Sequence, residues 1–437
     1  MLRRATALFA AWRLLAALGL LLAAGPAWAQ PAAGPAGPFV FSRAGRQQVR
    51  LQFFTQRNLI IVSAKLNGVG PLNFLLDTGV ATSLLTDPAV ADSLHLHHGT
   101  DYRVMGVGGS DSGIRAYEAD SVAVTMAGGG VVAPHLSWLV LNSDVLDLSG
   151  YVGMRIHGLL GADFFRSFVV TIRPEQFELV LHNPATYRAP RGKHWATLPL
   201  RFEQGKPYVT AQVRQLATGA GGAATLPLQL VLDTGAGHAL SLETTADRRL
   251  HLPPTSLRTD LGRGLSGIVS GALGRVANVQ LGQYQLPQVL TSFPDSSQVH
   301  QRLSARERAL RQGNLGYEVL KRFTCVIDYS RHQLLLRPTA ALREPFEHDM
   351  SGIDLMAIGQ NYRRYLVQRV MPGSPADDAG IQPEEELMSI NFTPVTAYSI
   401  SEVNRMLHSE DGRLLVLMLR RPNGNLHPAA VRLKRRI

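Results

Sequence analysis

Short apolar runs separated by turn-forming residues dominate the chain between about residues 40 and 338. The runs are rich in Val, Leu, Ile and Phe and are bounded by Gly, Asn and Asp, as in Asn58 to Leu66 and Phe177 to Leu181. Because this alternation is typical of β-strands, the pattern predicts a mainly β fold. The clearest helical segment is the charged stretch from Ser304 to Gln312, which begins at a serine suited to cap a helix.

An internal repeat runs through this region. The tripeptide Asp-Thr-Gly follows an apolar triplet at Asp77 and again at Asp233, an offset of 156 residues. An apolar-Gly element lies further along, ending at Gly161 in the first copy and at Gly316 in the second, an offset of 155. Because the landmarks keep one order and nearly one offset, we expect two similar β-barrel-like lobes related by a pseudo-twofold axis.

The last part of the chain has the pattern of a separate module. A strand-like run from Tyr365 to Val370 precedes a Pro-Gly turn, and Ser399 and Glu402 have the spacing of a capping box. These features predict a small β-rich domain with one or two helices. The expected plan is a signal peptide (1–29), a disordered leader (30–39), an N-terminal lobe (40–182), a linker (183–197), a C-terminal lobe (198–338), a second linker (339–350) and the final module (351–437).

The first 29 residues have the pattern of a cleaved export signal. Arg3 and Arg4 give a positive start, an apolar stretch is densest from Leu14 to Ala24, and Ala27-Trp28-Ala29 precedes the expected cleavage site. We therefore expect a periplasmic or secreted protein with no transmembrane segment after signal removal. The alternative is an uncleaved membrane anchor, which the short apolar run disfavours.

Charge and cysteine content narrow the classes of function. The formal net charge is +11, but the basic residues are scattered except near the C-terminus, and no binding motif accompanies them. No nucleic-acid partner is therefore predicted. The single cysteine, Cys325, cannot form an intramolecular disulfide, and its apolar surroundings predict a core position. His95, His97 and His98 have no further ligand group at a suitable spacing, so we expect no metal site and no cofactor.

The paired Asp-Thr-Gly tripeptides carry the candidate chemistry. Two aspartates within a hydrogen bond of each other share one proton, so that one is a base and the other an acid at the same pH. Such a pair activates water for peptide hydrolysis. Asp77 and Asp233 are the predicted catalytic residues, with no fixed role for either because the pair titrates as a unit. The threonines are expected to brace the opposite lobe and the glycines to allow close backbone approach: Thr78, Gly79, Thr234 and Gly235.

These landmarks resemble those of retropepsin-like and pepsin-like aspartic proteases over roughly residues 40–338. Both tripeptides look like catalytic loops, and Leu159-Leu160-Gly161 and Asn314-Leu315-Gly316 look like the apolar-Gly element that packs under each loop. A glycine-rich segment is similar to the retropepsin flap: Gly106, Val107, Gly108 and Gly109. The resemblance implies a cleft between two lobes and endopeptidase activity through an activated water. One chain suffices for one site, because both lobes keep the tripeptide.

The sequence departs from the family pattern in three places. Asn314 stands where the second apolar-Gly element usually has an apolar residue. His238 follows the second tripeptide closely, where it can alter the electrostatics of the cleft. The flap tyrosine has two candidates, Tyr102 and Tyr117, and the sequence does not choose between them.

The final module resembles a PDZ domain, chiefly in the stretch from Pro372 to Ile381. The resemblance implies that a peptide terminus binds by strand addition beside the Ser399–Leu407 helix. Ser351, Gly352 and Ile353 are the expected carboxylate-binding loop. A purely structural domain is the alternative, since Glu384-Glu385-Glu386 stands where such domains often have Gly-Asp.

The combined prediction is an exported aspartic endopeptidase that takes polypeptide substrates and recruits peptides through the PDZ module. The competing hypothesis is a non-catalytic peptide-binding protein that uses the same cleft and groove. Preservation of both carboxylates argues against it, because a binding protein does not need a matched pair. A protease restricted to one partner and a broad digestive protease both remain open.

Overall fold

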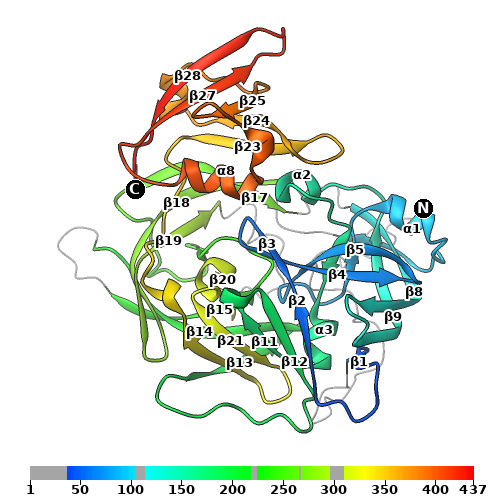
Figure 1. Cartoon of the computed structure of the whole chain (residues 1–437). Coiled ribbons are helices and arrows are strands. Elements are labelled where there is room, and N and C mark those ends of the chain that lie inside the picture. The colour runs from blue at the N-terminus through cyan, green and yellow to red at the C-terminus, as the bar shows by residue number, and fades with distance from the viewer. Residues whose placement is uncertain (1–36, 105–113, 218–223, 265–266, 296–309) are drawn as a thin grey trace, which may run out of the picture.

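The computed structural model describes residues 37–104, 114–217, 224–264, 267–295 and 310–437. The predicted export signal, most of the predicted leader, the flap glycines and most of the predicted Ser304–Gln312 helix lie outside these residues. Within them, no helix has the length and apolar character needed to cross a membrane. The fold is mainly β, as predicted, and Figure 1 shows two large lobes with a smaller domain beside them.

The N-terminal lobe is built on a nine-stranded sheet in which the order is β1-β9-β6-β10-β5-β4-β8-β7, with β3 beside β4. Its strands are β1 (Val40–Phe41), β2 (Gln48–Gln52), β3 (Phe54–Gln56), β4 (Leu59–Leu66), β5 (Val69–Leu76), β6 (Leu84–Leu85), β7 (Asp101–Val104), β8 (Ile114–Met126), β9 (Val131–Leu141), β10 (Gly158–Leu160), β11 (Val169–Arg173) and β12 (Glu178–His182). Its helices are α1 (Pro88–Ser93), α2 (Leu148–Val152), α3 (Ala162–Ser167) and a 3-10 turn at Pro174–Gln176.

The C-terminal lobe consists mainly of strands β13 (Ala196–Glu203), β14 (Lys206–Arg214), β15 (Thr225–Asp233), β16 (Leu240–Leu242), β17 (Ser256–Gly264), β18 (Gly267–Leu281), β19 (Tyr284–Pro294), β20 (Gly313–Gly316), β21 (Phe323–Asp328) and β22 (Gln333–Pro338). Helix α6 (Tyr317–Leu320) and a 3-10 helix at Ala340–Arg343 complete the described part. The first strand, β13, begins inside the region expected to be a linker.

Strand pairing in the two lobes is equivalent, which confirms the predicted pseudo-twofold relation. In the N-terminal lobe β10 runs parallel to β5, with Leu159 opposite Leu75. In the C-terminal lobe β20 runs parallel to β15, with Asn314 opposite Val231. In each lobe the short strand also pairs antiparallel with its other neighbour, β6 or β16. Each Asp-Thr-Gly tripeptide therefore leaves the central strand of a corresponding unit.

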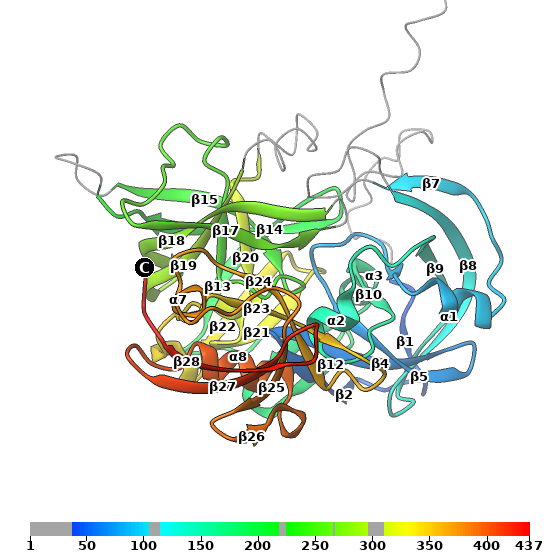
Figure 2. The same cartoon turned by 90° about the horizontal axis from the view of Figure 1, so that it is seen from above.

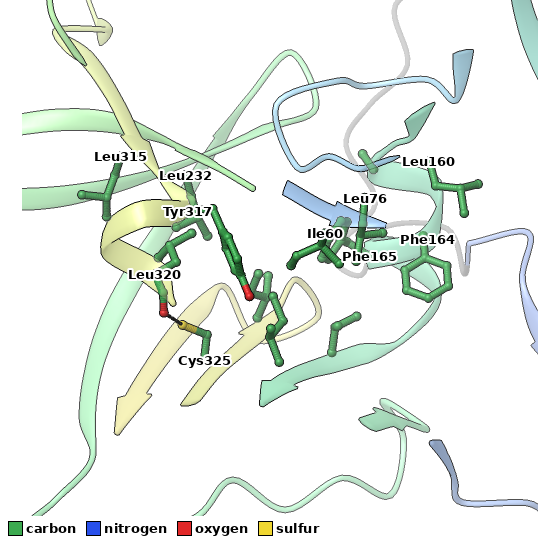
Figure 3. Packing of buried hydrophobic residues seen from close by; sticks show 14 of the residues in the cluster. Ile60, Leu76, Leu160, Phe164, Phe165, Leu232, Leu315, Tyr317, Leu320 and Cys325 are labelled. Atoms are coloured by element: carbon green, nitrogen blue, oxygen red, sulfur yellow. Dashed lines mark hydrogen bonds between the residues drawn. The ribbon is translucent and has the colours of Figure 1, made fainter. Parts of the chain in front are cut away.

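One sheet joins the lobes. Strands β11, β12 and β2 extend the 13-stranded sheet of the C-terminal lobe, and β11 pairs antiparallel with β21 through Thr171 and Val326. The apolar core is also continuous between the lobes. Figure 3 shows Leu76 and Phe165 on one side and Leu232 on the other, all fully buried. Packing, rather than a disulfide, therefore holds the lobes together.

Cys325 lies in this core, as the sequence predicts. Its thiol donates to the carbonyl of Leu320 over 3.3 Å. Burial raises the pKa of the thiol well above its ordinary value. The side chain therefore acts as a small core residue and not as a reactive group.

The third domain has its own core and sheet, in the order β23-β24-β25-β27-β28 with β26 beside β25. Its elements are β23 (Ile353–Ile358), β24 (Arg364–Val370), α7 (Pro375–Asp378), β25 (Glu386–Ile390), β26 (Thr393–Pro394), a 3-10 helix at Val395–Ala397, α8 (Ile400–Leu407), β27 (Leu414–Arg420) and β28 (Leu426–Arg432). The predicted capping box is present, because Ser399 and Glu402 each accept from the backbone amide of the other. Figure 2 shows the domain from above.

Candidate active site

The two Asp-Thr-Gly loops meet between the lobes and are locked together by their threonines. The amide of Thr78 donates to Oγ1 of Thr234, and the amide of Thr234 donates to Oγ1 of Thr78, each over 3.0 Å. The hydroxyl of Thr78 donates to the carbonyl of Leu232 over 2.6 Å, and that of Thr234 donates to the carbonyl of Leu76 over 2.8 Å. Both threonines are fully buried, so these four reciprocal bonds brace the loops without competition from water.

This brace brings Asp77 and Asp233 together. An ideal Cβ on Gly79 would lie 3.0 Å from Oδ1 of each aspartate, so the two oxygens are within twice that distance of each other. A Cβ on Gly235 would lie 2.2 Å from the Asp77 carboxyl group, which explains why that position requires glycine. The glycine amides donate to the carboxylates, Gly79 to Asp77 over 2.6 Å and Gly235 to Asp233 over 3.1 Å.

The electrostatics of the pair favour a shared proton. Burial is the main cause that raises the pKa of Asp77, and the neighbouring charge of Asp233 acts in the same direction, so that this pKa lies at about 8. The positive charge of Lys206 acts in the opposite direction but is a smaller influence. Because two close carboxyl groups cannot both ionise without repulsion, the pair holds one proton at neutral pH. The site therefore presents an acid and a base side by side.

The two departures noted near the second loop both lie at the dyad. Nδ2 of Asn314 donates to Oδ2 of Asp233 over 2.7 Å. His238 is half-buried close to Asp233, and desolvation lowers the pKa of its imidazole. The unusual asparagine was visible in the sequence, but its contact with Asp233 depends on the pairing of β20 with β15, which the sequence alone does not give.

The predicted flap lies outside the described residues at Gly106 to Gly109, between β7 and β8. Both tyrosine candidates lie on those strands. Tyr102 donates to Glu118 over 3.1 Å, and Tyr117 stacks on the ring of His98. In the other lobe, β17 and β18 form the corresponding hairpin. The strands β7 and β17 therefore occupy corresponding positions at an edge of each sheet.

The expected carboxylate-binding loop of the third domain already binds a carboxylate of the chain itself. The amides of Ser351 and Gly352 donate to the two oxygens of Asp349 over 3.0 and 2.6 Å. The amide of Ile353 donates to the hydroxyl of Ser351 over 3.1 Å. Gly352 has φ +83°, and a Cβ there would lie 2.2 Å from Ser374, so this turn requires glycine.

Strand β23 and helix α8 of the third domain both face the N-terminal lobe. An ideal Cβ on Gly153, at the end of α2, would lie 2.7 Å from Ile400 of α8. A Cβ on Gly150 would lie 2.8 Å from Met356 of β23. Helix α2 therefore packs against both β23 and α8.

Arg57, in the turn between β3 and β4, adds polar contacts to this interface. Its amide donates to the hydroxyl of Ser401 over 2.8 Å, and its guanidinium donates to the carbonyl of Leu355 over 2.5 Å. The same guanidinium lies 4.4 Å from the centre of the Tyr151 ring. Asn58, the next residue, donates to the carbonyl of Gly237 in the loop that follows the second tripeptide. One turn thus contacts both the third domain and the catalytic loop region.

The fold is that of an aspartic-protease-like protein of two lobes, in which each lobe carries one Asp-Thr-Gly loop. A family model described as aspartyl protease matches residues 62–164 and again residues 212–319, and a PDZ-domain model matches residues 366–421. The chain therefore consists of a repeated aspartyl-protease domain followed by a PDZ domain.

Solved structures of low identity show similarity to parts of the chain. The chain is similar to an aspartic proteinase from Irpex lacteus, with 14% identity, 68% of this chain and 99% of that chain covered, and a TM-score of 0.39. Basic 7S globulin from soybean has 9% identity, with coverages of 69% and 97% and a TM-score of 0.39. A photosystem II D1 C-terminal processing protease has 21% identity, and the match spans only 19% of this chain and 22% of that chain, with a TM-score of 0.18. No curated protein matches the chain.

Proposed function

We propose that the chain is an exported aspartic endopeptidase that hydrolyses peptide bonds with one water held between Asp77 and Asp233. The observation that carries the proposal is the reciprocal threonine brace, which holds two carboxyl groups face to face. A protein that only binds peptides has no use for two adjacent carboxyl groups, one buried and one half-buried, that destabilise one another. The two aspartyl-protease matches, one in each lobe, support the same function.

The chemistry uses the shared proton. The ionised carboxylate takes a proton from the water as the water oxygen attacks the peptide carbonyl carbon, and the protonated carboxyl gives its proton to the carbonyl oxygen. The tetrahedral diol then collapses, the C–N bond breaks and the nitrogen receives a proton. A new carboxyl terminus and a new amine leave, and the pair again holds one proton. Each positioned acid–base group of this kind contributes ~10²–10⁴-fold to the rate.

The PDZ domain is proposed to recruit polypeptides to the protease. β23 is an edge strand of its sheet, so a peptide can add to it beside α8. Arg57 and α2 occupy this side of the domain, and Asp349 occupies the loop amides. A peptide terminus therefore has to displace both contacts, and recruitment depends on movement of the PDZ domain away from the N-terminal lobe.

Two substitutions test the catalytic proposal. Asp77→Asn and Asp233→Asn should each abolish cleavage of fluorescently labelled casein while the far-ultraviolet circular dichroism stays unchanged. Asp92→Asn, on the exposed face of α1, is the matched control and should keep full activity. A statine-type inhibitor should block the parent, and serine reagents and chelators should not. Cleavage by both dyad variants would disprove the assignment, and peptide affinity without any cleavage by the parent would favour the binding protein instead.

Export is proposed from the N-terminal pattern. If the signal is cleaved as proposed, the protein recovered from the periplasm or the medium begins at Gln30 by mass spectrometry. Protein that retains Met1 and sediments with membranes would instead support the anchor.

A further inference from the structure

The two lobes differ at one equivalent position beside the dyad. Leu159 of β10 lies opposite Leu75, and Asn314 of β20 lies opposite Val231. Leu75 and Val231 occupy the same position in the strand that leads to each tripeptide, so Leu159 and Asn314 are equivalent. Leu159 packs in an apolar cluster. Asn314 instead directs an amide donor at Oδ2 of Asp233 over 2.7 Å. The two lobes therefore depart from pseudo-twofold symmetry at Asn314, which contacts a carboxylate of the dyad.

Packing alone does not favour an asparagine here. Its Oδ1 is buried, and no residue in the described part of the chain donates to it. A buried amide oxygen without a donor is destabilising, whereas leucine fills the same place in the other lobe without this penalty. The hydrogen bond from Nδ2 to Asp233 is the favourable interaction that offsets the cost of the buried, unpaired Oδ1.

Several titratable groups surround the dyad. Burial lowers the pKa of His238, so this imidazole is neutral. Arg311 lies 2.8 Å from Glu243, which compensates its charge. The charge of Lys206 on β14 acts to lower the pKa of Asp77, and Tyr329 is buried near Asp77 with a raised pKa. The neutral amide of Asn314 differs from these groups, because its Nδ2 donates directly to Oδ2 of Asp233 over 2.7 Å.

We propose that Asn314 is a positioning residue that makes the two aspartates unequal, holding the negative charge on Asp233 and the shared proton on Asp77. This inference rests on the proposed peptidase function for its catalytic meaning. A hydrogen bond donated to a carboxylate favours the charged form of that carboxylate. Asp233 is then the base that takes the proton of the attacking water, and Asp77 is the acid that protonates the carbonyl oxygen.

The test replaces Asn314 with the residue that the other lobe uses. In Asn314→Leu the charged form of Asp233 loses its donor, so the acid limb of the pH profile of kcat/KM on labelled casein should move to higher pH by about one unit. Leu159→Met changes the packing at the equivalent position without adding a donor, and its acid limb should stay at the parent position. Asn314→Val should shift the acid limb by the same amount, and it replaces Asn314→Leu in the test if the leucine variant does not fold. If a folded leucine or valine variant has its acid limb at the same pH as the parent, the proposal is overturned.

A second measurement separates this inference from the proposed function. The carboxyl carbons of ¹³C-labelled aspartate report the titration of the dyad by NMR, and Asp233→Asn identifies the signals of the pair. The lower apparent pKa of the pair should rise in Asn314→Leu. If the parent cleaves no protein, the peptidase proposal fails, but this titration still decides the role of Asn314. An unchanged lower pKa would refute that role even in an active enzyme.

Discussion

Replacing Thr78 by valine tests whether the threonine brace holds the two lobes in register. Valine has nearly the same shape, so the change removes a hydroxyl without opening a cavity. Two bonds are lost: the one that Thr78 Oγ1 accepts from the amide of Thr234 and the one that it donates to the carbonyl of Leu232. Because both partners stay buried, Thr78→Val should lower the free energy of unfolding by roughly 2–4 kcal/mol.

Urea denaturation followed by tryptophan fluorescence measures this loss, with Thr197→Val as the control because Thr197 is exposed on β13. The pseudo-twofold symmetry adds a stricter condition. Thr234→Val removes the two equivalent bonds to Thr78 and Leu76, so it should be destabilising by a similar amount. A loss below ~0.5 kcal/mol in either variant, the level of an ordinary surface substitution, would refute the reasoning.

Three further predictions follow from other parts of the structure. The first concerns Asp77, whose pKa is raised from the ordinary value of 3.8 to about 8, so that the native state keeps a proton that the unfolded chain loses. Stability should therefore fall as the pH rises from about 4 to about 8, by up to ~1.4 kcal/mol per unit, and Asp77→Asn should flatten this slope. Second, Arg57→Ala should increase amide hydrogen exchange in β23 and α8, because it removes the guanidinium bond to Leu355 and the contact with Tyr151. Arg43→Ala, at an exposed turn, is the control for that experiment. Third, Cys325 should react with iodoacetamide only upon unfolding, because burial raises the pKa of its thiol.

Each of these has a clear opposing result. A pH slope that survives in Asp77→Asn would show that another group carries the extra proton. Equal exchange in the Arg57 and Arg43 variants would show that the arginine does not hold the PDZ domain in place. Rapid alkylation of the native protein would place Cys325 outside the core.

Much of the fold was predictable because the chain repeats itself. The Asp-Thr-Gly tripeptides and the apolar-Gly elements keep nearly one offset, and the same offset reappears in the pairing of β10 with β5 and of β20 with β15. The threonine brace followed from residue type, since a buried hydroxyl beside a paired loop needs a partner. Such inferences rest on local sequence and on symmetry, both of which are visible in one chain.

Other features depend on contacts between segments that are distant in sequence. Nothing in the sequence around Arg57 distinguishes it from an ordinary surface arginine, although it binds both Leu355 and Ser401 in the PDZ domain. Asp349 likewise gave no sign that it occupies the carboxylate-binding loop of its own domain. The sequence also does not show that β11 and β21 pair in one sheet across the two lobes. The arrangement of these segments follows from the docking of whole domains, which no local pattern specifies.

The most direct test of the central claim is a crystal structure of the protein with a statine-containing peptide. The statine hydroxyl takes the place of the attacking water, so it should lie within hydrogen-bonding distance, about 2.6–3.2 Å, of one carboxylate oxygen of Asp77 and one of Asp233. A peptide bound elsewhere, or a hydroxyl that contacts only one of the two aspartates, would contradict the claim that they act on a common water.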